Sequence, residues 1–165
     1  MAYGQQHGER EHGLDATGLL RAQLREIHRQ LDEELTEWLG RLAPAAPASG
    51  SRVVALYVHA ATVEDVTIQS LLRQVAPMYE TAWAGTGPGH YSTTDLAPLR
   101  AYAQQVFAAT DAYLAGLSFD DVNETVDLSR LGHGRPTRAW VMSKFVVLQV
   151  AQICGELTCA VQHQY

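Results

Sequence analysis

The sequence predicts an all-α protein in which four long helices form one antiparallel-type bundle. Apolar residues recur at spacings of three and four over four segments, at about residues 17–42, 51–75, 95–116 and 137–162. Links rich in proline and glycine separate these segments, and such links end helices. The chain has 165 residues, which is long enough to bury a core without disulfides or a structural metal. The pattern therefore favours four helices packed around one core.

Composition and charge restrict the classes of function. Residues 1–14 contain no apolar run that could act as a signal peptide, so we expect a flexible N-terminal tail there and a single domain at 15–165. No segment has about eighteen consecutive apolar residues, which argues against a membrane partner. With a formal charge of -6 and no basic run, nucleic acid is not an expected partner. Cys154 and Cys159 are expected to be reduced, buried thiols of a cytoplasmic protein.

The first helix, at about 17–42, has the most regular apolar spacing in the chain. Its stripe consists of Leu20, Leu24, Ile27, Leu31, Leu35 and Leu39. Arginines and acidic residues occupy the other faces, as on a solvated surface. We place His28 among these outward-facing residues. Pro44 and Pro47 end the helix.

The second helix, at about 51–75, carries a histidine in its apolar stripe. Leu56, His59 and Val63 are spaced by three and four, so we expect His59 to face the interior. A histidine on an apolar face is usually a hydrogen-bonded core residue, and an acid–base or ligand role is the alternative.

A long loop rich in glycine and aromatic residues separates the second and third helices. Loops of this length in compact domains often act as lids or binding segments. Trp83, His90 and Tyr91 are therefore candidate substrate contacts that would close over the mouth of the bundle. The alternative is a surface loop whose aromatic rings only pack on the helix ends.

The third helix, at about 95–116, is predicted to begin at the cap Thr94, with Pro98 early enough to be tolerated. Its expected buried face is Leu99, Tyr102, Val106, Thr110, Tyr113 and Leu117. A short extra helix should precede the last long helix, because Ser118 and Asp121 have the spacing of a capping box.

The last helix, at about 137–162, has polar residues within its apolar stripe. The stripe is Val141, Phe145, Leu148, Gln152, Gly155 and Cys159, flanked by Gln149 and Glu156. A buried amide without a partner costs about 1 to 3 kcal/mol, so Gln149 and Gln152 need a hydrogen-bonding neighbour, a water or a ligand. Hydrogen bonds across the core, or a position at the edge of solvent, are the plainer alternative.

Residues 149–157 of this helix, QVAQICGEL, resemble the DinB/YfiT-like four-helix bundles, many of which depend on a metal. The last helix of that family commonly reads H-x-A-x-H-x-G-E/Q, and Ala151, Gly155 and Glu156 match it. The family's third metal ligand is a histidine on the second helix, and His59 matches that position. The resemblance covers about residues 19–161, and it implies the fold of the family.

The resemblance also implies that the metal site is degenerate. The three ligand positions hold His59, Gln149 and Ile153, and only the histidine is a good ligand for zinc or nickel. His90, Glu156 and His163 are poorly placed to replace the missing ligands. We therefore expect no metal and no other cofactor.

On this basis we expect a metal-independent enzyme that transforms a small molecule, in a biosynthetic step, within the bundle cavity. His59 would act as acid and base, with Gln149 and Gln152 completing the catalytic set. The expected substrate contacts are Tyr57, Trp83, His90, Tyr91, Ile153 and Glu156. The alternatives are a non-catalytic protein that binds a small molecule or a partner and, by resemblance, a transferase that uses low-molecular-weight thiols.

A homodimer is also expected. Apolar residues on the second and fourth helices exceed what one inward stripe needs, and the surplus is Val54, Val58, Val146 and Val150. By resemblance, DinB-like bundles commonly pair through helix faces.

Overall fold

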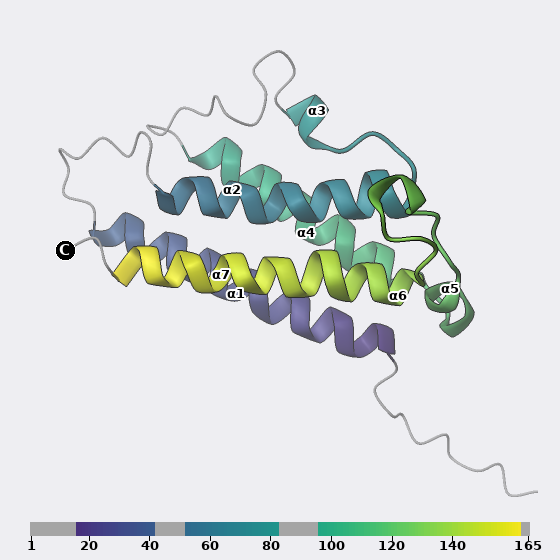
Figure 1. Cartoon of the computed structure of the whole chain (residues 1–165). Helices are drawn as coiled ribbons and strands as arrows, with labels where there is room; N and C mark the ends of the chain where they lie inside the picture. The colour runs from purple at the N-terminus through teal and green to yellow at the C-terminus, as the bar shows by residue number, and fades with distance from the viewer. Residues whose placement is uncertain (1–15, 42–51, 83–95, 163–165) are drawn as a thin grey trace, which may run out of the picture.

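The computed structural model describes residues 16–41, 52–82 and 96–162 (Figure 1). The predicted tail and the predicted substrate contacts Trp83, His90 and Tyr91 lie outside the described residues. Within the described ranges there is one isolated β-bridge, between Thr125 and Thr137, and no strand. The predicted all-α class is confirmed.

Four long helical segments make up most of this structure. The first is α1 (Ala16–Arg41). The second is α2 (Arg52–Asp65), which continues directly as the π-helix η1 (Val66–Leu72). The third is α4 (Ala97–Ala115). The fourth consists of α6 (Arg138–Val141), the π-helix η3 (Met142–Val147) and α7 (Leu148–Gln162).

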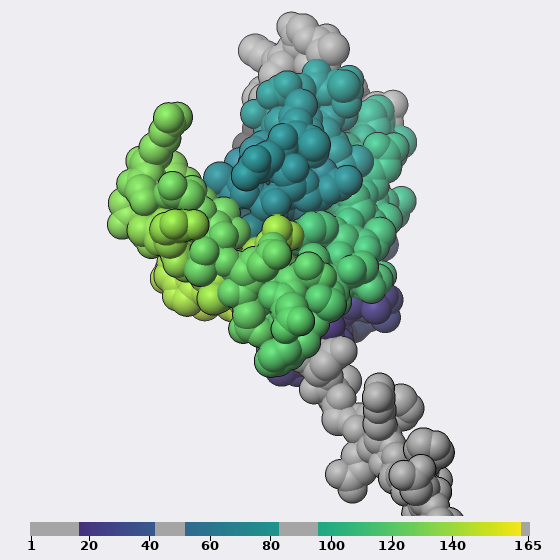
Figure 2. All heavy atoms as spheres, turned by 90° about the vertical axis from the view of Figure 1, so that its right-hand side faces the viewer, coloured from purple at the N-terminus to yellow at the C-terminus, as the bar shows by residue number. Residues whose placement is uncertain are grey.

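Short helices lie in the connections. These are α3 (Tyr79–Ala82), α5 (Phe119–Asn123) and the 3-10 helix η2 (Ser129–Leu131). The expected short helix before the last long helix is α5, and its predicted capping box between Ser118 and Asp121 is present. Figure 2 views the molecule from this end, with the connection between α4 and α6 in green beside the teal end of the second segment.

The long segments do not simply alternate in direction (Figure 1). α1 and α7 run the same way, because Gln30 and Glu34 on α1 contact Cys154 and Thr158 on α7 in the same order. α2 and α4 also run the same way, and opposite to α1 and α7. Parallel neighbours need a long connection, whereas alternating helices need only short turns. The long link between α2 and α4 therefore belongs to this arrangement.

The inward stripe predicted for the last segment is wrong after its first turn. Its buried side chains are Val141, Met142, Val146, Val150, Ile153, Cys154, Leu157 and Val161. Gln149 and Gln152 are exposed, and Glu156 is half-buried. The buried face instead follows Met142, Val146, Val150, Ile153, Leu157 and Val161 at spacings of four and three, because these aliphatic side chains remove more apolar surface from water than a stripe that contains glutamine. The glutamine amides lie outside this face and are solvated.

The inward orientation predicted for His59 is also wrong. His59 is exposed, and the buried residues of α2 are Val53, Val54, Tyr57, Val58, Ala60, Ala61, Glu64 and Asp65. The helix buries this face because its valines remove more apolar surface from water than a face that contains histidine. On α1, by contrast, the predicted leucines Leu20, Leu24, Leu31 and Leu35 are buried as expected.

The apolar surplus from which a homodimer was predicted belongs to the core of a single chain. Val54, Val58, Val146 and Val150 are all buried, at most 3% exposed. Burial within one chain explains these residues without a partner. The homodimer stays a prediction, but these four valines no longer support it.

One helix, Arg138–Gln162, is long and apolar enough by length and composition to cross a membrane. The same helix packs its valines into the core, and its outer face carries Lys144, Gln149 and Gln152. The core helix of a water-soluble protein has these properties as well. The structure is compatible with a soluble protein, and the cytoplasmic location stays a prediction.

Candidate functional site

A buried acidic residue on α2 pairs with a histidine on α1. Glu64 is 0% exposed, and its Oε2 lies 2.7 Å from Nε2 of His28. The His28 ring stacks on the ring of Phe107 of α4, with centroids 3.8 Å apart and planes 10° apart. His28 therefore points into the molecule, and the expectation that it faces outward is wrong.

A second polar pair joins the same two helices. The Tyr57 hydroxyl donates to Oδ1 of Asp32 over 2.5 Å. Asp32 follows His28 by about one turn, and Tyr57 precedes Glu64 by about two turns, so both pairs lie between the same helix faces. Burial, together with the acceptor Asp32, raises the pKa of the Tyr57 hydroxyl, which remains a donor. We call Asp32, Tyr57, His28 and Glu64 the inner polar row.

Two buried oxygens at this site have no hydrogen-bond partner among the described residues. They are Oε1 of Glu64 and Oγ1 of Thr110. Thr110 and His28 both line a cavity of about 10 Å³ between α1 and α4, which is room for about one water molecule. Buried polar atoms in folded proteins are nearly always bonded, so these two oxygens call for a partner such as water.

Two arginines and an aspartate form the rim of this cavity. Arg21 and Arg25 each donate two hydrogen bonds to the carboxylate of Asp111, at 2.9 to 3.0 Å. These bonds hold the pKa of Asp111 well below its usual range. Arg21, Arg25 and His28 follow one another at spacings of four and three on α1, so one helix face carries both the rim and the histidine.

The residue after Glu64 has a different, fully bonded environment. Asp65 is 0% exposed, and its carboxylate accepts hydrogen bonds from the N–H groups of Met78 and Tyr79 and from the Tyr102 hydroxyl, at 2.9 to 3.0 Å. Burial, together with the charge of Asp65, raises the pKa of the Tyr102 hydroxyl. Asp65 thus anchors the chain at the start of α3, which is a structural role.

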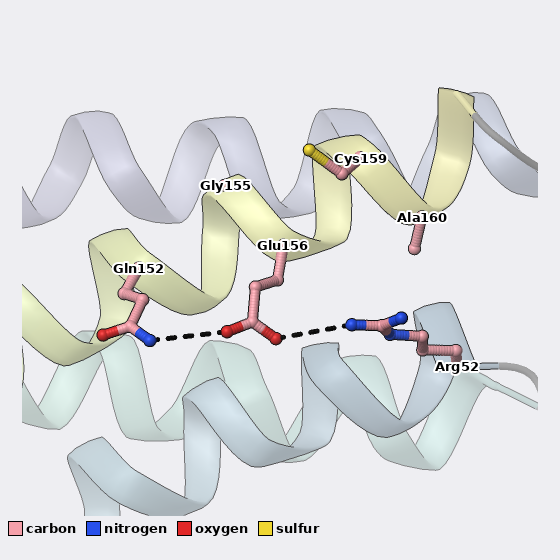
Figure 3. Close-up of a pocket in the computed structure, with 6 residues that line it drawn as sticks. All are labelled: Arg52, Gln152, Gly155, Glu156, Cys159 and Ala160. Carbon is pink, nitrogen blue, oxygen red and sulfur yellow. Dashed lines mark hydrogen bonds and ion pairs between the residues drawn. The ribbon is translucent and has the colours of Figure 1, made fainter.

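Part of the predicted site lines a groove on the outer surface instead (Figure 3). This outer groove has a volume of about 550 Å³ and is lined by Arg52, Gln152, Gly155, Glu156, Cys159 and Ala160. One oxygen of Glu156 accepts a hydrogen bond from the Gln152 amide at 3.4 Å, and the other lies 3.7 Å from the Arg52 guanidinium. Of the sequence-predicted site residues, the structure brings Gln152 and Glu156 together here.

The other predicted residues separate into two groups. Tyr57 and Ile153 are buried in the core, and so they do not line the outer groove. His59 and Gln149 are exposed on α2 and α7. α2 and α7 are antiparallel, and the Arg52–Glu156 pair joins them. His59 lies about two turns after Arg52, and Gln149 lies about two turns before Glu156, so the two residues lie at the same level, beyond the groove.

The two cysteines also differ from each other. Cys159 is exposed, which corrects the expectation of two buried thiols, whereas Cys154 is buried. Burial raises the pKa of the Cys154 thiol, with a smaller contribution from Glu34. Cys154 is therefore an unreactive core residue, and the outer groove contains the accessible thiol.

Sequence reasoning missed His28, Glu64 and Thr110 as one site. A signal was present, because Leu24, His28 and Leu31 have the same spacings of four and three that identify the buried stripe. Tyr57, Ala61, Glu64 and Ile68 repeat this pattern on the second segment. The contact between the two polar residues depends on how α1 and α2 pack, which spacing alone does not give.

The residues that the structure describes include no group of three or more His, Cys, Asp or Glu side chains placed to hold a metal ion. The inner polar row supplies one imidazole and one carboxylate, and those atoms bond to each other. Catalytic zinc normally takes three protein ligands. An imidazole beside a carboxylate offers acid–base chemistry. No family model matches the chain, and no curated protein matches it either.

Proposed function

We propose that this chain is a DinB-like four-helix bundle that works as a metal-independent cytoplasmic enzyme on a small molecule, with His28 as its acid and base. The observation that supports this proposal is the fully buried Glu64 carboxylate, 2.7 Å from Nε2 of His28. Imidazole exchanges protons near neutral pH and needs no metal to do so. The role expected for His59 passes to His28, because His59 is exposed and lacks a carboxylate partner among the described residues.

In this proposal Glu64 orients the imidazole. With a proton on Nε2, His28 donates to the carboxylate and presents Nδ1 as an acceptor, while Phe107 fixes the plane of the ring. A carboxylate behind a histidine holds the tautomer and stabilises the imidazolium after a proton is gained. The pair can therefore accept a proton at Nδ1 and hold the positive charge that results.

A purely structural role explains this pair less well. Withdrawing the Glu64 carboxylate from water costs several kcal/mol, and apolar residues of similar volume in place of a buried polar pair are often equally stable or more stable. The unpartnered Oε1 of Glu64 adds to that cost. A chain that keeps such a pair in an otherwise leucine- and valine-rich core is better explained by chemistry than by stability.

The outer groove supports a second candidate function, which is binding without catalysis. Its volume of about 550 Å³ suits a small molecule, and Arg52 and Glu156 offer one charge of each sign. Because this ion pair is exposed and long, a ligand can replace either half at little cost. Transfer of a low-molecular-weight thiol also stays a proposal, with the exposed Cys159 in this groove as the nearest thiol.

The test is to incubate the purified protein with a defined mixture of small metabolites and to follow each compound by mass spectrometry. The wild type should consume at least one compound. His28→Gln and Glu64→Gln should each slow its consumption by about 100-fold or more, which is the usual contribution of a general acid or base. His59→Gln is the matched control, because it removes an exposed histidine, and it should consume the compound at the wild-type rate.

The two candidate functions give different results in this experiment. If no compound is consumed, or if His59→Gln is as damaging as His28→Gln, acid–base catalysis at His28 is wrong. Equilibrium dialysis against the same mixture then tests binding. A compound that is retained unchanged, and released by both Arg52→Ala and Glu156→Gln, would establish the outer groove as a binding site.

A further inference from the structure

We infer that the cavity between His28 and Thr110 binds one water molecule, and that this water connects the buried Glu64 to solvent as part of a proton relay. The inference rests on the proposed acid–base role of His28 and adds the route by which its proton is exchanged. Thr110 is then a positioning residue, since it acts through the water.

The size and the lining of the cavity both fit a single water. Its volume is about 10 Å³, at the lower limit of the roughly 10 to 15 Å³ that one water requires. A buried water also needs two to four polar partners. Thr110 Oγ1 is buried without a partner, and His28, Arg21, Arg25 and Asp111 supply the other polar groups around the cavity.

The Thr110 hydroxyl lacks the intrahelical hydrogen bond that many helical threonines make. A threonine in a helix often satisfies its hydroxyl on the carbonyl four residues earlier, as Thr67 does on Val63 at 2.8 Å. Thr110 is 1% exposed and makes no such bond. Because Thr110 lines a water-sized cavity, a bridging water there could satisfy its unpartnered hydroxyl.

The relay has a buried end and a surface end. Glu64 is 0% exposed, and the only described partner of its carboxylate is His28, whose side chain is 12% exposed. At the other end, the Arg21, Arg25 and Asp111 side chains are 29%, 61% and 32% exposed. The cavity lies between His28 and this solvated rim.

Proton transfer along this chain is balanced without any further reactant. The water gives a proton to Nδ1 of His28 and takes one from the solvent at the rim. The imidazole releases its Nε2 proton to Oε2 of Glu64, so that one proton moves from solvent to the carboxylate. The reverse sequence returns it, and no bond other than N–H and O–H bonds is formed or broken. The charged groups that face His28 in this process are Glu64, Arg21, Arg25 and Asp111.

Thr110→Val tests the relay, because valine has the shape of threonine but no hydroxyl. Nuclear magnetic resonance of ¹⁵N-labelled protein in water should show magnetisation transfer from a bound water to the His28 ring and the Thr110 side chain. In Thr110→Val that signal should disappear, and solvent exchange of the His28 ring N–H should slow by about tenfold, as for the loss of one hydrogen bond to the water. Thr110→Ser keeps a hydroxyl, so the water signal and the exchange rate of the His28 ring N–H should both match the wild type.

Thr67→Val is the matched control, since it removes a buried hydroxyl that already has an intrahelical partner. It should leave the His28 exchange rate unchanged. Equal exchange rates in wild type and Thr110→Val, or no water signal at His28 in the wild type, would overturn the inference. These measurements use no substrate, so a bound water in a protein that consumes no metabolite refutes only the proposed function, and turnover without the water refutes only the relay.

Discussion

Glu64 on α2 and Glu156 on α7 belong to the same residue type, and each pairs with one nitrogen-bearing side chain, but their surroundings are opposite. The Glu64 side chain is 0% exposed and 2.7 Å from His28, whereas Glu156 is 43% exposed and 3.7 Å from Arg52. An exposed pair is screened by water and contributes about 0 to 1 kcal/mol. Removing one half of a buried pair costs about 3 to 5 kcal/mol, because the other half stays buried without a partner. Depth in the core, rather than residue type, therefore separates the inner polar row from the outer groove.

Asp65 is a third case, a buried carboxylate whose hydrogen bonds are all made within the protein. Asp65→Ala leaves two backbone N–H groups and the Tyr102 hydroxyl without their acceptor, and each unsatisfied buried group costs about 1 to 3 kcal/mol. We expect the free energy of unfolding to fall by at least about 3 kcal/mol in urea denaturation. Asp120→Ala, on the exposed side of α5, is the control and should change it by less than about 0.5 kcal/mol.

Replacing the inner pair tests whether stability or function retains it. His28→Leu alone leaves Glu64 unpaired and should cost about 3 kcal/mol or more. The double variant His28→Leu with Glu64→Leu removes both polar groups, and it should be about as stable as the wild type or up to about 4 kcal/mol more stable. Urea denaturation of the single and double variants measures both values. A double variant that is clearly less stable than wild type would show that the pair serves the fold itself.

How much the sequence predicts differs along the chain for a physical reason. The stripe of α1 follows from its 3.6-residue period, and Leu20, Leu24, Leu31 and Leu35 are buried as that period requires. The last segment carries two apolar stripes one residue apart, the predicted one through Val141 and Phe145 and the buried one through Met142, Val146 and Val150. Both have spacings of three and four, so period alone does not choose between them. The protein buries the stripe without glutamine, which leaves Gln149 and Gln152 at the surface.

The candidate site was less predictable than the fold. Its two halves, His28 and Glu64, lie 36 positions apart, and each has the spacing of a buried residue on its own helix. His28 lies among arginines and acidic residues in the sequence of α1, and such clusters of charged residues are usually solvated. That pattern favoured an outward orientation for His28. Their 2.7 Å contact follows from the way α1 and α2 pack, which is a tertiary property.

An intermediate case between the two regions is Asp111, at the rim of the cavity. Its arginine partners make the pKa of Asp111 lower in the folded chain than in the unfolded chain. The ionised carboxylate therefore stabilises the fold at pH values above about 4, the ordinary pKa of Asp. This stability is lost as the pH falls below about 4 toward the folded pKa. Because the side chain is 32% exposed, we expect only about 1 kcal/mol. Near neutral pH, the free energy of unfolding of the wild type should exceed that of Asp111→Asn by this amount. The two curves of this free energy against pH should converge in acid. A difference that stays constant with pH would mean that the charge of Asp111 is not its cause.

Substitutions in the outer groove should change the stability of the protein least. Arg52→Ala, Glu156→Gln and the double variant should each change the free energy of unfolding by less than about 0.5 kcal/mol, since both side chains regain water when the pair is lost. The coupling energy from this double-mutant cycle should likewise stay below about 0.5 kcal/mol. Urea denaturation at low salt favours detection of a surface pair, because added salt screens exposed charges. A coupling above about 1.5 kcal/mol would be typical of a desolvated pair, and the groove would then have to be regarded as part of the interior, like the pair at Glu64.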